Sequence, residues 1–285
     1  MEKQYRGRIA PSPTGLLHLG HARTFWTAFQ RSQAANGTLL FRNDDLDPHR
    51  SKPEFIAAMI EDLHWLGIKW QTPIINQSER IPLYKAALEK LIAQGDTYEC
   101  TCTRKDLATS SHAPHEDEDD EPIYNGKCRP EKNSLSSRPE RSEVERPPNL
   151  SSPNTTIRFR IPTTNPIHFE DANLGPQTFT PQQDFGDFLL WSRDNIPSYQ
   201  LANVVDDAAM HITEVVRGAD LLKSTARQIL LQRALNLPTP SYFHCELVRD
   251  EHNLRLAKRH DALSLRTLRA QGLTPAAILA QFERQ

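Results

Sequence analysis

The sequence of 285 residues has only four cysteines and no long apolar run. Two of the cysteines are one residue apart, so the set is not typical of a disulfide framework and favours reduced thiols or metal ligands. No apolar run approaches the ~20 residues of a membrane helix, and residues 1–7 lack the apolar core of a secretion signal. These absences predict a cytoplasmic protein that does not interact with membranes.

A strong excess of either charge is also absent. The 34 lysines and arginines nearly balance the 36 aspartates and glutamates, which gives a formal net charge of −2. Six of the acids form one run at residues 116–121, and with those six set aside the formal charge changes from −2 to +4. Such a run is typical of a solvated loop, so the net charge neither supports nor excludes an RNA partner. The 38% of hydrophobic and 25% of charged residues are typical of a globular enzyme.

The most informative segment is residues 8–23, which read RIAPSPTGLLHLGHAR. This segment predicts a strand that ends at Ala10, a turn with two prolines and a glycine, and a helix that begins near Gly20. The helix should end at residues 36–37, an Asn-Gly pair typical of helix C-termini. A second strand is expected at residues 38–42. Strand, helix and strand in this order predict a right-handed βαβ unit, the opening of a nucleotide-binding parallel sheet.

Two histidines lie on either side of the expected helix start. Main-chain N–H groups and the helix dipole favour anions there, so His18 and His21 are expected to donate hydrogen bonds to the oxygens of a triphosphate. The PSPTG and HLGH segments together resemble the HIGH element of class I aminoacyl-tRNA synthetases, in the form that glutamyl-tRNA synthetases use. The resemblance implies an α/β fold with a Rossmann-like parallel sheet. It also implies that His18, Gly20 and His21 bind ATP, which is a substrate together with Mg²⁺. The carboxylate of an amino acid would attack the α-phosphorus and release pyrophosphate.

The resemblance continues along the chain and covers nearly all of it except about fifty residues in the middle. It includes FRNDDLD at 41–47, QSER at 77–80 and the segments 184–207 and 214–221. The family's mobile lysine loop, the KMSKS element, corresponds to RLAKR at residues 255–259. Lys258 matches the second lysine, Arg255 stands in for the first, and Ala257 replaces the serine, so that the charge is kept and a hydroxyl donor is lost. The resemblance implies that Arg255 and Lys258 bind ATP. It also implies that Lys258 is catalytic, like His18 and His21. Without the resemblance, RLAKR would be typical of a basic surface cluster.

Glutamate carries two carboxylates and one ammonium group, so its pocket requires guanidinium groups and an acidic partner. The resemblance implies that arginines bind the carboxylates, that a tyrosine hydroxyl reaches the substrate, and that an aspartate binds the ammonium group. The residues with these roles are Arg8 and Arg217, Tyr199 and Asp44. Ser12 and the main chain around Ala10 would line the same pocket.

Two of these positions allow other interpretations. Asp44 stands where the family has glutamate and is one methylene shorter, so either the pocket shifts or a water bridges the gap. It could instead have a purely structural role. Arg217 could form a structural ion pair with Glu214 or Asp220.

The cysteines indicate a zinc site at the two ends of the middle segment. Zinc takes four ligands, mostly sulfur or nitrogen, and three cysteines leave one ligand open. Ligand preference alone favours His112 or His115, whereas a resemblance of residues 123–128 to a Y-x-G-x-C segment of the family implies Tyr124. Uncoordinated thiols are the alternative. A zinc ion would hold both ends of the insertion together. The three cysteines are Cys100, Cys102 and Cys128.

We expect three segments: 1–97 as the first half of the catalytic domain, 98–155 as a zinc-bearing insertion, and 156–285 as the second half. Residues 105–154 are rich in Ser, Pro, Glu and Arg, a composition that favours a mobile loop. Elsewhere, helices are expected from 53 to 66, from 84 to 94 and from 275, and a strand at 156–161. Residues 198–205 and 208–216 are expected to supply the second part of the parallel sheet.

Residues 262–282 resemble only the start of the continuation that leads to an anticodon-binding domain in glutamyl-tRNA synthetases, so no such domain is expected. This short C-terminus and the cysteine pattern resemble glutamyl-queuosine tRNA(Asp) synthetases. That resemblance implies activation of L-glutamate and its ester linkage to queuosine in the anticodon loop of tRNA(Asp), a single-stranded target, by a monomeric enzyme. The alternatives are a truncated glutamyl-tRNA synthetase that charges the 3′ end of tRNA(Glu) and a catalytically silent RNA-binding relic.

Overall fold

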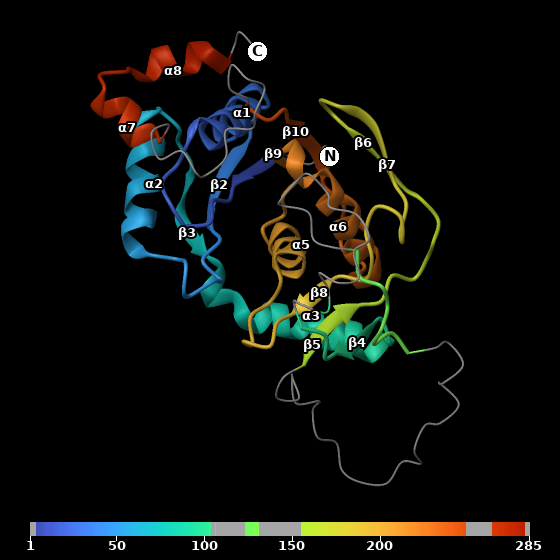
Figure 1. The fold of residues 1–285 in the computed structure, drawn as a ribbon. Coiled ribbons are helices and arrows are strands. Elements are labelled where there is room, and N and C mark those ends of the chain that lie inside the picture. Colours follow the sequence, from blue (N-terminus) through green and yellow to red (C-terminus); the bar gives the residue numbers. More distant parts are fainter. Residues whose placement is uncertain (1–3, 104–105, 107–122, 131–154, 249–263, 283–285) are drawn as a thin grey trace.

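Parallel strands from both halves of the chain form the centre of the molecule (Figure 1). The computed structural model describes residues 4–103, 106, 123–130, 155–248 and 264–282. The first half forms a parallel sheet in the order β1-β2-β3, with bounds Arg6–Ile9, Thr38–Asn43 and Gln71–Asn76. The second half forms a sheet in the order β7-β6-β10-β9, with bounds Gly175–Phe179, Ile167–Asp171, Ser241–Cys245 and Glu214–Gly218. In this sheet β9, β10 and β6 are parallel, and β7 is antiparallel to β6.

The two parallel sheets meet at β1 and β9. The main-chain N–H of Thr213, just before β9, donates to the carbonyl of Arg6 in β1 at 2.9 Å. From this junction the strands of the first half extend to one side (β1, β2, β3) and those of the second half to the other (β9, β10, β6). The order of the strands along the chain therefore changes direction between β1 and β9, and the carboxyl ends of these two strands lie at the same edge. In open α/β sheets, ligands bind at this switch point. The fold thus directs attention to the residues that follow Ile9 and to those at the end of β9.

The expected βαβ unit is confirmed. β1 and β2 are parallel, and α1 (Leu19–Ala34) connects them. α2 (Pro53–Trp65) begins at a proline, whose missing N–H costs nothing in a first helical turn. α3 (Ile81–Gln94) ends at Gly95, which has a positive φ of 79°, a conformation that glycine adopts without strain. Short 3₁₀ segments precede α3 and α6, at Gln77–Arg80 and Ala219–Leu221.

One expectation about the second half was wrong. Residues 198–205 do not form a strand, because they lie at the start of α5 (Tyr199–Ala209). The Ser198 side chain accepts a hydrogen bond from the main-chain N–H of Leu201, as an N-cap residue does. Leu201, Ala202 and Val204 of this helix are buried in the core. Of the expected strand at 208–216, only residues 214–216 lie in β9, which extends to Gly218.

A third sheet, antiparallel, lies beside the parallel strands (Figure 1). Its order is β4-β5-β8, with bounds Thr97–Cys100, Thr156–Phe159 and Leu189–Trp191. The strand expected at 156–161 is therefore present, and Cys100 pairs with Thr156. This pairing holds the two ends of the middle segment next to each other. The expected boundaries of that segment, at 97/98 and 155/156, stay a prediction.

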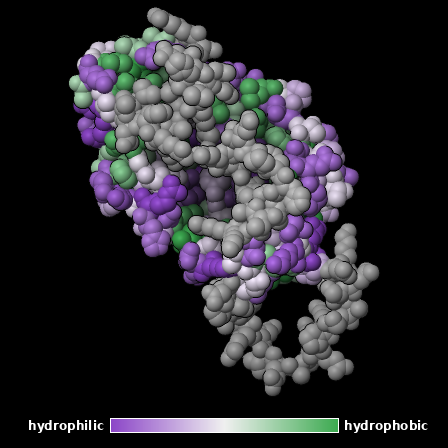
Figure 2. Space-filling model, viewed as in Figure 1, coloured by the Kyte–Doolittle hydropathy of each residue, from purple (hydrophilic) through white to green (hydrophobic). Residues whose placement is uncertain are grey.

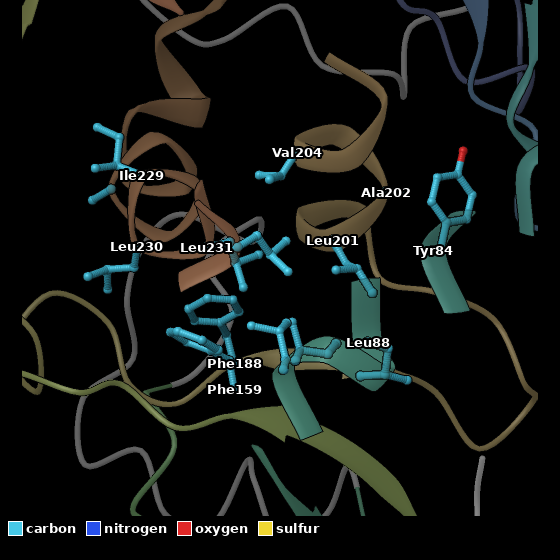
Figure 3. Close-up of a cluster of buried hydrophobic side chains, with 14 of the residues drawn as sticks. Tyr84, Leu88, Phe159, Phe188, Leu201, Ala202, Val204, Ile229, Leu230 and Leu231 are labelled. Atoms are coloured by element: carbon cyan, nitrogen blue, oxygen red, sulfur yellow. The ribbon is translucent and has the colours of Figure 1, made fainter. Parts of the chain in front are cut away.

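Three helices pack around the largest hydrophobic core cluster of the described residues (Figure 3). They are α3, α5 and α6 (Leu222–Leu235). Leu88 of α3, Leu201 of α5 and Leu231 of α6 are completely buried, together with Phe159 from β5. Truncating such a side chain to alanine typically costs about 2–5 kcal/mol. This cluster joins the third sheet to the second half of the parallel sheet.

The second cluster packs α1, α2, α7 (Leu265–Ala270) and α8 (Pro275–Phe282) around the first sheet. α8 confirms the helix expected from residue 275. The face of the molecule drawn in Figure 2 is largely hydrophilic in its described part, with hydrophobic residues in separate groups. Within the described residues, no helix is both long and apolar enough to cross a membrane.

Candidate active site

The HLGH segment forms the start of α1 at the switch point. His18 is the N-cap residue, and its Nδ1 accepts a hydrogen bond from the main-chain N–H of Gly20 at 3.1 Å. Nδ1 of His21 accepts from the main-chain N–H of His18 at 3.5 Å, and the two rings stack with centroids 3.8 Å apart. Because Nδ1 is the acceptor in both rings, each neutral imidazole carries its proton on Nε2. Two N–H donors of fixed tautomer therefore accompany a helix N-terminus, an arrangement suited to phosphate oxygens.

The main chain at Gly20 closely approaches the His18 ring. A Cβ atom at this position would lie 3.1–3.2 Å from the His18 ring. The adjacent turn is also held in place, since the main-chain N–H of Asp44 donates to the carbonyl of Pro11 at 3.0 Å. On the C-terminal side, the main-chain N–H of Leu265 donates to the carbonyl of Leu17 at 2.8 Å, and His18 forms a β-bridge with Ser264. The start of α7 is thus anchored directly on the histidine segment.

Arg217, at the carboxyl end of β9, is a buried cation whose partners are neutral. It is 4% exposed. Its Nε lies 3.2 Å from Nε2 of His244, its Nη1 donates to the Tyr199 hydroxyl at 3.3 Å, and its Nη2 donates to Thr225 Oγ1 at 2.7 Å. Within the described part of the chain, no carboxylate forms a salt bridge with it. A buried guanidinium of this kind favours the binding of an anion.

The ion pair of Arg217 with Glu214 is excluded by the partners of Glu214. Both carboxylate oxygens of Glu214 are held by Arg31, at 2.6 and 2.7 Å, and one also accepts from Tyr5 at 2.8 Å. Arg8 approaches Arg217 from the neighbouring strand, because its Nη1 donates to the carbonyl of Val216 at 3.3 Å. The structure therefore brings Arg8, Arg217 and Tyr199 close together at the switch point, and their binding of glutamate stays a prediction.

A buried network of acids and arginines surrounds Arg42, and sequence reasoning did not single it out. Arg42 is fully buried; it donates to both oxygens of Asp44 at 2.7 and 3.3 Å and to Asp207 at 2.7 Å. Asn203 accepts from it at 2.6 Å, and Asp206 lies 3.7 Å from its Nε. A charged residue inside the apolar strand TLLFRN was the available signal, because arginine is rarely fully buried without partners.

The same network connects Arg8 and Asp44. Asp207 accepts from Arg8 at 3.1 Å, so that Arg8, unlike Arg217, already has a carboxylate partner. Burial raises the pKa of the Asp44 carboxyl to about 6, although Arg42 opposes this shift. Asp44 thus lies among buried charges close to the expected pocket, and Arg42 engages both of its oxygens. Ala10 and Ser12 lie in the turn after β1, and Ser12 is exposed.

The three predicted cysteine ligands lie together at the end of β4. Their sulfur atoms are all within 4.8 Å of one another, and Sγ of Cys102 lies 3.6 Å from Sγ of Cys128. The Tyr124 hydroxyl lies 3.5 Å from Sγ of Cys100 and 3.7 Å from Sγ of Cys102. Zn–S bonds of ~2.3 Å in a tetrahedron place two sulfurs about 3.8 Å apart, and a sulfur and an oxygen about 3.5 Å apart. The observed spacings fit these values, so the cluster could hold a metal ion such as zinc.

Surrounding contacts hold Tyr124 in this position. Its ring lies under the guanidinium of Arg158 at 4.1 Å, and its hydroxyl accepts from the main-chain N–H of Cys128 at 2.7 Å. A Cβ at Gly186 would lie 2.8 Å from the main chain of Tyr124, so only glycine allows this approach. Burial acts to raise the pKa of the Cys128 thiol, but hydrogen bonds from Tyr124 and Thr101 outweigh it and lower that pKa to about 6. A thiolate is the form that binds metal.

Several expected site residues lie outside the described residues. They include the two expected ATP ligands of the RLAKR segment, Arg255 and Lys258, and the two candidate zinc-binding histidines, His112 and His115. The acidic run at residues 116–121, which is expected to form a solvated loop, also lies outside them.

Comparison with known proteins decides the family. Residues 4–285 match the family described as tRNA synthetases class I (E and Q), catalytic domain. The chain belongs to this family. It is 40% identical over 284 residues to a glutamyl-Q tRNA(Asp) synthetase of Rhodobacter capsulatus, with 95% of this chain and 97% of that protein aligned. A second glutamyl-Q tRNA(Asp) synthetase, from Symbiobacterium thermophilum, is 41% identical, with 97% and 84% aligned.

Longer class I synthetases are similar as well. A glutamate–tRNA ligase of Aquifex aeolicus is 39% identical, and the alignment covers 95% of this chain and 55% of that protein. A crystal structure of a glutamate tRNA ligase from Elizabethkingia meningosepticum, in complex with its amino acid, matches with a TM-score of 0.72 at 25% identity. That match covers 90% of this chain and 52% of the other. The predicted fold class, a class I synthetase catalytic domain with a parallel sheet, is therefore confirmed.

For a class I synthetase, the geometry accounts for binding better than for acid–base catalysis. The histidine donors and the helix start can orient phosphates, and Arg217 can hold a carboxylate. Attack on a phosphoryl group requires positioning and positive charge above all. The described part of the site supplies both, and none of its side chains needs to remove a proton from the attacking carboxylate.

Proposed function

We propose that this protein activates L-glutamate with ATP and transfers it to queuosine at the wobble position of tRNA(Asp), acting as a glutamyl-Q tRNA(Asp) synthetase. The observation that carries the proposal is Arg217, a buried cation without a carboxylate partner among the described residues. Such a cation suits an amino acid whose side chain is itself a carboxylate. The relatives at about 40% identity over nearly the whole chain carry this name, which supports the RNA substrate.

In the first step, His18 and His21 donate hydrogen bonds through Nε2 to phosphate oxygens of ATP, and Gly20 allows the phosphates close to the helix start. Mg²⁺ enters with ATP as part of the substrate. The glutamate α-carboxylate attacks the α-phosphorus, glutamyl-adenylate forms, and pyrophosphate leaves. The histidines act as donors and do not shuttle protons, because phosphoryl transfer depends on charge and alignment. Arg255 and Lys258 as further ATP ligands stay a prediction.

The glutamate itself is held by groups of both signs. Arg217 and the Tyr199 hydroxyl bind a carboxylate, with Arg8 beside them, and the loop at Ala10 and Ser12 lines the pocket. Asp44 provides negative charge for the ammonium group. Since both of its oxygens are engaged by Arg42, we expect the ammonium group to interact with Asp44 through a remaining lone pair or through a bridging water.

The reaction can be tested by where the glutamate goes. The protein, ATP, Mg²⁺ and radiolabelled glutamate are incubated with tRNA(Asp) that carries queuosine, with tRNA(Asp) that carries guanine at the same position, and with tRNA(Glu). We expect label only on the first RNA, and the label should survive removal of the 3′-terminal adenosine. Label on tRNA(Glu) that trimming removes would instead identify an enzyme that charges the 3′ end. The absence of both label and glutamate-dependent pyrophosphate exchange would favour the silent relic.

We also propose a structural zinc ion bound by the three cysteines, with the Tyr124 hydroxyl as fourth ligand. Its chemistry there would be to hold the middle segment closed on β4, with no part in the reaction. The observed sulfur and oxygen spacings support this assignment. We expect the protein to act in the cytoplasm, where thiols stay reduced. A monomeric state also stays a prediction.

Metal analysis tests the zinc site. We expect about one zinc per chain in the native protein, a near-complete loss in Cys102→Ser, and a lower melting temperature in that variant, because metal binding contributes to folding. Cys245→Ser is the control, since this thiol lies in β10 outside the cluster and its variant should keep the metal. Tyr124→Phe, which keeps the ring under Arg158, should weaken zinc binding. A metal-free native protein of unchanged stability would contradict the site, and full affinity in Tyr124→Phe would shift the fourth ligand to another residue.

A further inference from the structure

Three neighbouring strands of the second sheet place a carboxylate, an imidazole and a guanidinium in one row. Arg217 of β9 is opposite His244 of β10, and Tyr242 of β10 is opposite Asp171 of β6. Nδ1 of His244 lies 2.6 Å from Oδ2 of Asp171, and Nε2 of His244 lies 3.2 Å from Nε of Arg217. All three side chains are nearly inaccessible to solvent, with exposures of 2%, 0% and 4%.

The hydrogen-bond chemistry of this row has one consistent assignment. The Arg217 guanidinium can only donate, so Nε2 of His244 must accept, and the ring proton must be on Nδ1. From Nδ1 it is donated to Asp171. Burial, and then the nearby charge of Arg217, lower the pKa of His244 to about 4, so the ring is neutral at physiological pH.

Asp171 is held as an anion by several donors. Its carboxylate accepts from the main-chain N–H groups of Asn173 and Leu174 at 3.1 and 2.9 Å, and from that of His244 at 3.2 Å. These bonds, with that of the His244 ring, lower the pKa of Asp171 in spite of its burial. An ionised acid thus lies one imidazole away from Arg217 and balances its charge without touching it.

The row leaves part of Arg217 available. A guanidinium has five N–H donors. One, on Nε, is used by His244, one on Nη1 by Tyr199 and one on Nη2 by Thr225. One donor on each terminal nitrogen has no partner among the described residues. Two donors, one on each terminal nitrogen, can serve the two oxygens of a carboxylate.

We propose that His244, oriented by Asp171, is a positioning residue that fixes the Arg217 fork toward the carboxylate of the substrate. The inference rests on the proposed glutamate site and adds two residues to it. A direct Asp–Arg pair would use donors of the guanidinium on the protein's own acid, as the Nε of Arg8 does with Asp207 at 3.1 Å. The interposed imidazole lets the protein tolerate a buried cation and still keep both donors for the ligand. Ordering the guanidinium before binding also lowers the entropic cost of holding glutamate.

Two substitutions at residue 244 separate its two hydrogen bonds. In His244→Asn, the amide N–H₂ can replace Nδ1 toward Asp171, and the acceptor for Arg217 is lost. In His244→Gln, the longer side chain can place its amide oxygen near the former Nε2. Tyr242→Phe is a matched control on the same strand, because it removes a buried hydroxyl bonded to Gln232 at 3.0 Å and keeps the ring beside Arg217.

Glutamate- and ATP-dependent pyrophosphate exchange gives the readout, together with thermal melting of each full-length variant. We expect His244→Asn to raise the KM for glutamate about 10- to 100-fold with an unchanged KM for ATP, and His244→Gln to restore much of the affinity. Tyr242→Phe should lower the melting temperature and leave both KM values unchanged. Asp171→Asn should raise the KM for glutamate as well, because the amide carries no charge.

Three results would overturn the positioning role. One is a parental KM for glutamate in His244→Asn. The second is a failure of Gln to do better than Asn at this position. The third is an equal rise of both KM values, which would indicate a purely structural residue. An inactive parent with every tRNA would overturn the proposed function, and an active parent with unaffected variants would overturn only the role of His244.

Discussion

Replacement of Arg217 by alanine should abolish glutamate activation, with a loss of about a thousandfold or more in kcat/KM for glutamate. The substituted site would lose both donors that face the substrate carboxylate, and truncating a buried charge partner of this kind typically costs 2–5 kcal/mol or more. Arg217→Lys should rescue little of the loss, because an ammonium group cannot reproduce the planar fork. Pyrophosphate exchange at saturating ATP measures the effect.

The protein offers a control for this experiment. Arg233, in the last turn of α6, is an exposed arginine, and Arg233→Ala should have parental kinetics. Calorimetric binding of ATP without glutamate should be unchanged in Arg217→Ala, which shows that the fold and the histidine segment are intact. Near-normal glutamate activation in Arg217→Ala would refute the assignment of this residue, and with it the main support for the proposed substrate.

Replacement of Arg42 by methionine should have the largest effect on stability, a loss of about 3–5 kcal/mol. Methionine fills much of the same volume, so the expected cost arises from charge. Three carboxylates, those of Asp44, Asp206 and Asp207, would lose their shared cation while they remain buried. Breaking a buried pair from one side leaves uncompensated charge, which is costlier than removing both partners. Urea denaturation measures the loss.

Arg80→Met is the matched control for the Arg42 prediction. Arg80 also contacts Asp206, at 2.6 Å, but its side chain is 20% exposed and pairs with this one acid among the residues that the structure describes. Asp206 would keep its bonds to Gln77 and Tyr84, both at 2.8 Å. We expect a loss of only about 1 kcal/mol. Equal losses in the two variants would mean that the network around Arg42 adds nothing beyond pairwise contacts.

The reliable part of the sequence analysis was local. Residues 8–23 contain their own turn and helix signals, and the prediction of strand, turn and helix there was confirmed to within a residue or two. The proline near the start of α2 and the glycine after α3 also marked those ends correctly. The assignment of residues 198–205 to a strand was wrong, because Ser198 caps the helix α5 that begins at Tyr199.

The missed residues are those whose function depends on distant partners. Arg42 interacts with Asp207, 165 residues away, and with Asn203, 161 residues away, and no spacing within the chain indicates such contacts. His244 and Asp171, separated by 73 residues, were passed over for the same reason. The sequence showed charged residues in apolar surroundings but not which of them share a bond.

By itself, therefore, the sequence determined the βαβ opening, the histidine pair at the helix start and the cysteines available to a metal, because each depends on residues close together in the chain. Only the tertiary structure decided which of two buried arginines has a carboxylate partner among the described residues. Arg8 and Arg217 are both buried arginines from adjacent strands, but folding brings Asp207 to Arg8 and the neutral ring of His244 to Arg217. That difference in partners, a carboxylate in one case and an imidazole in the other, leaves Arg217 without a carboxylate partner among the described residues, and its proposed role in ligand binding rests on this difference.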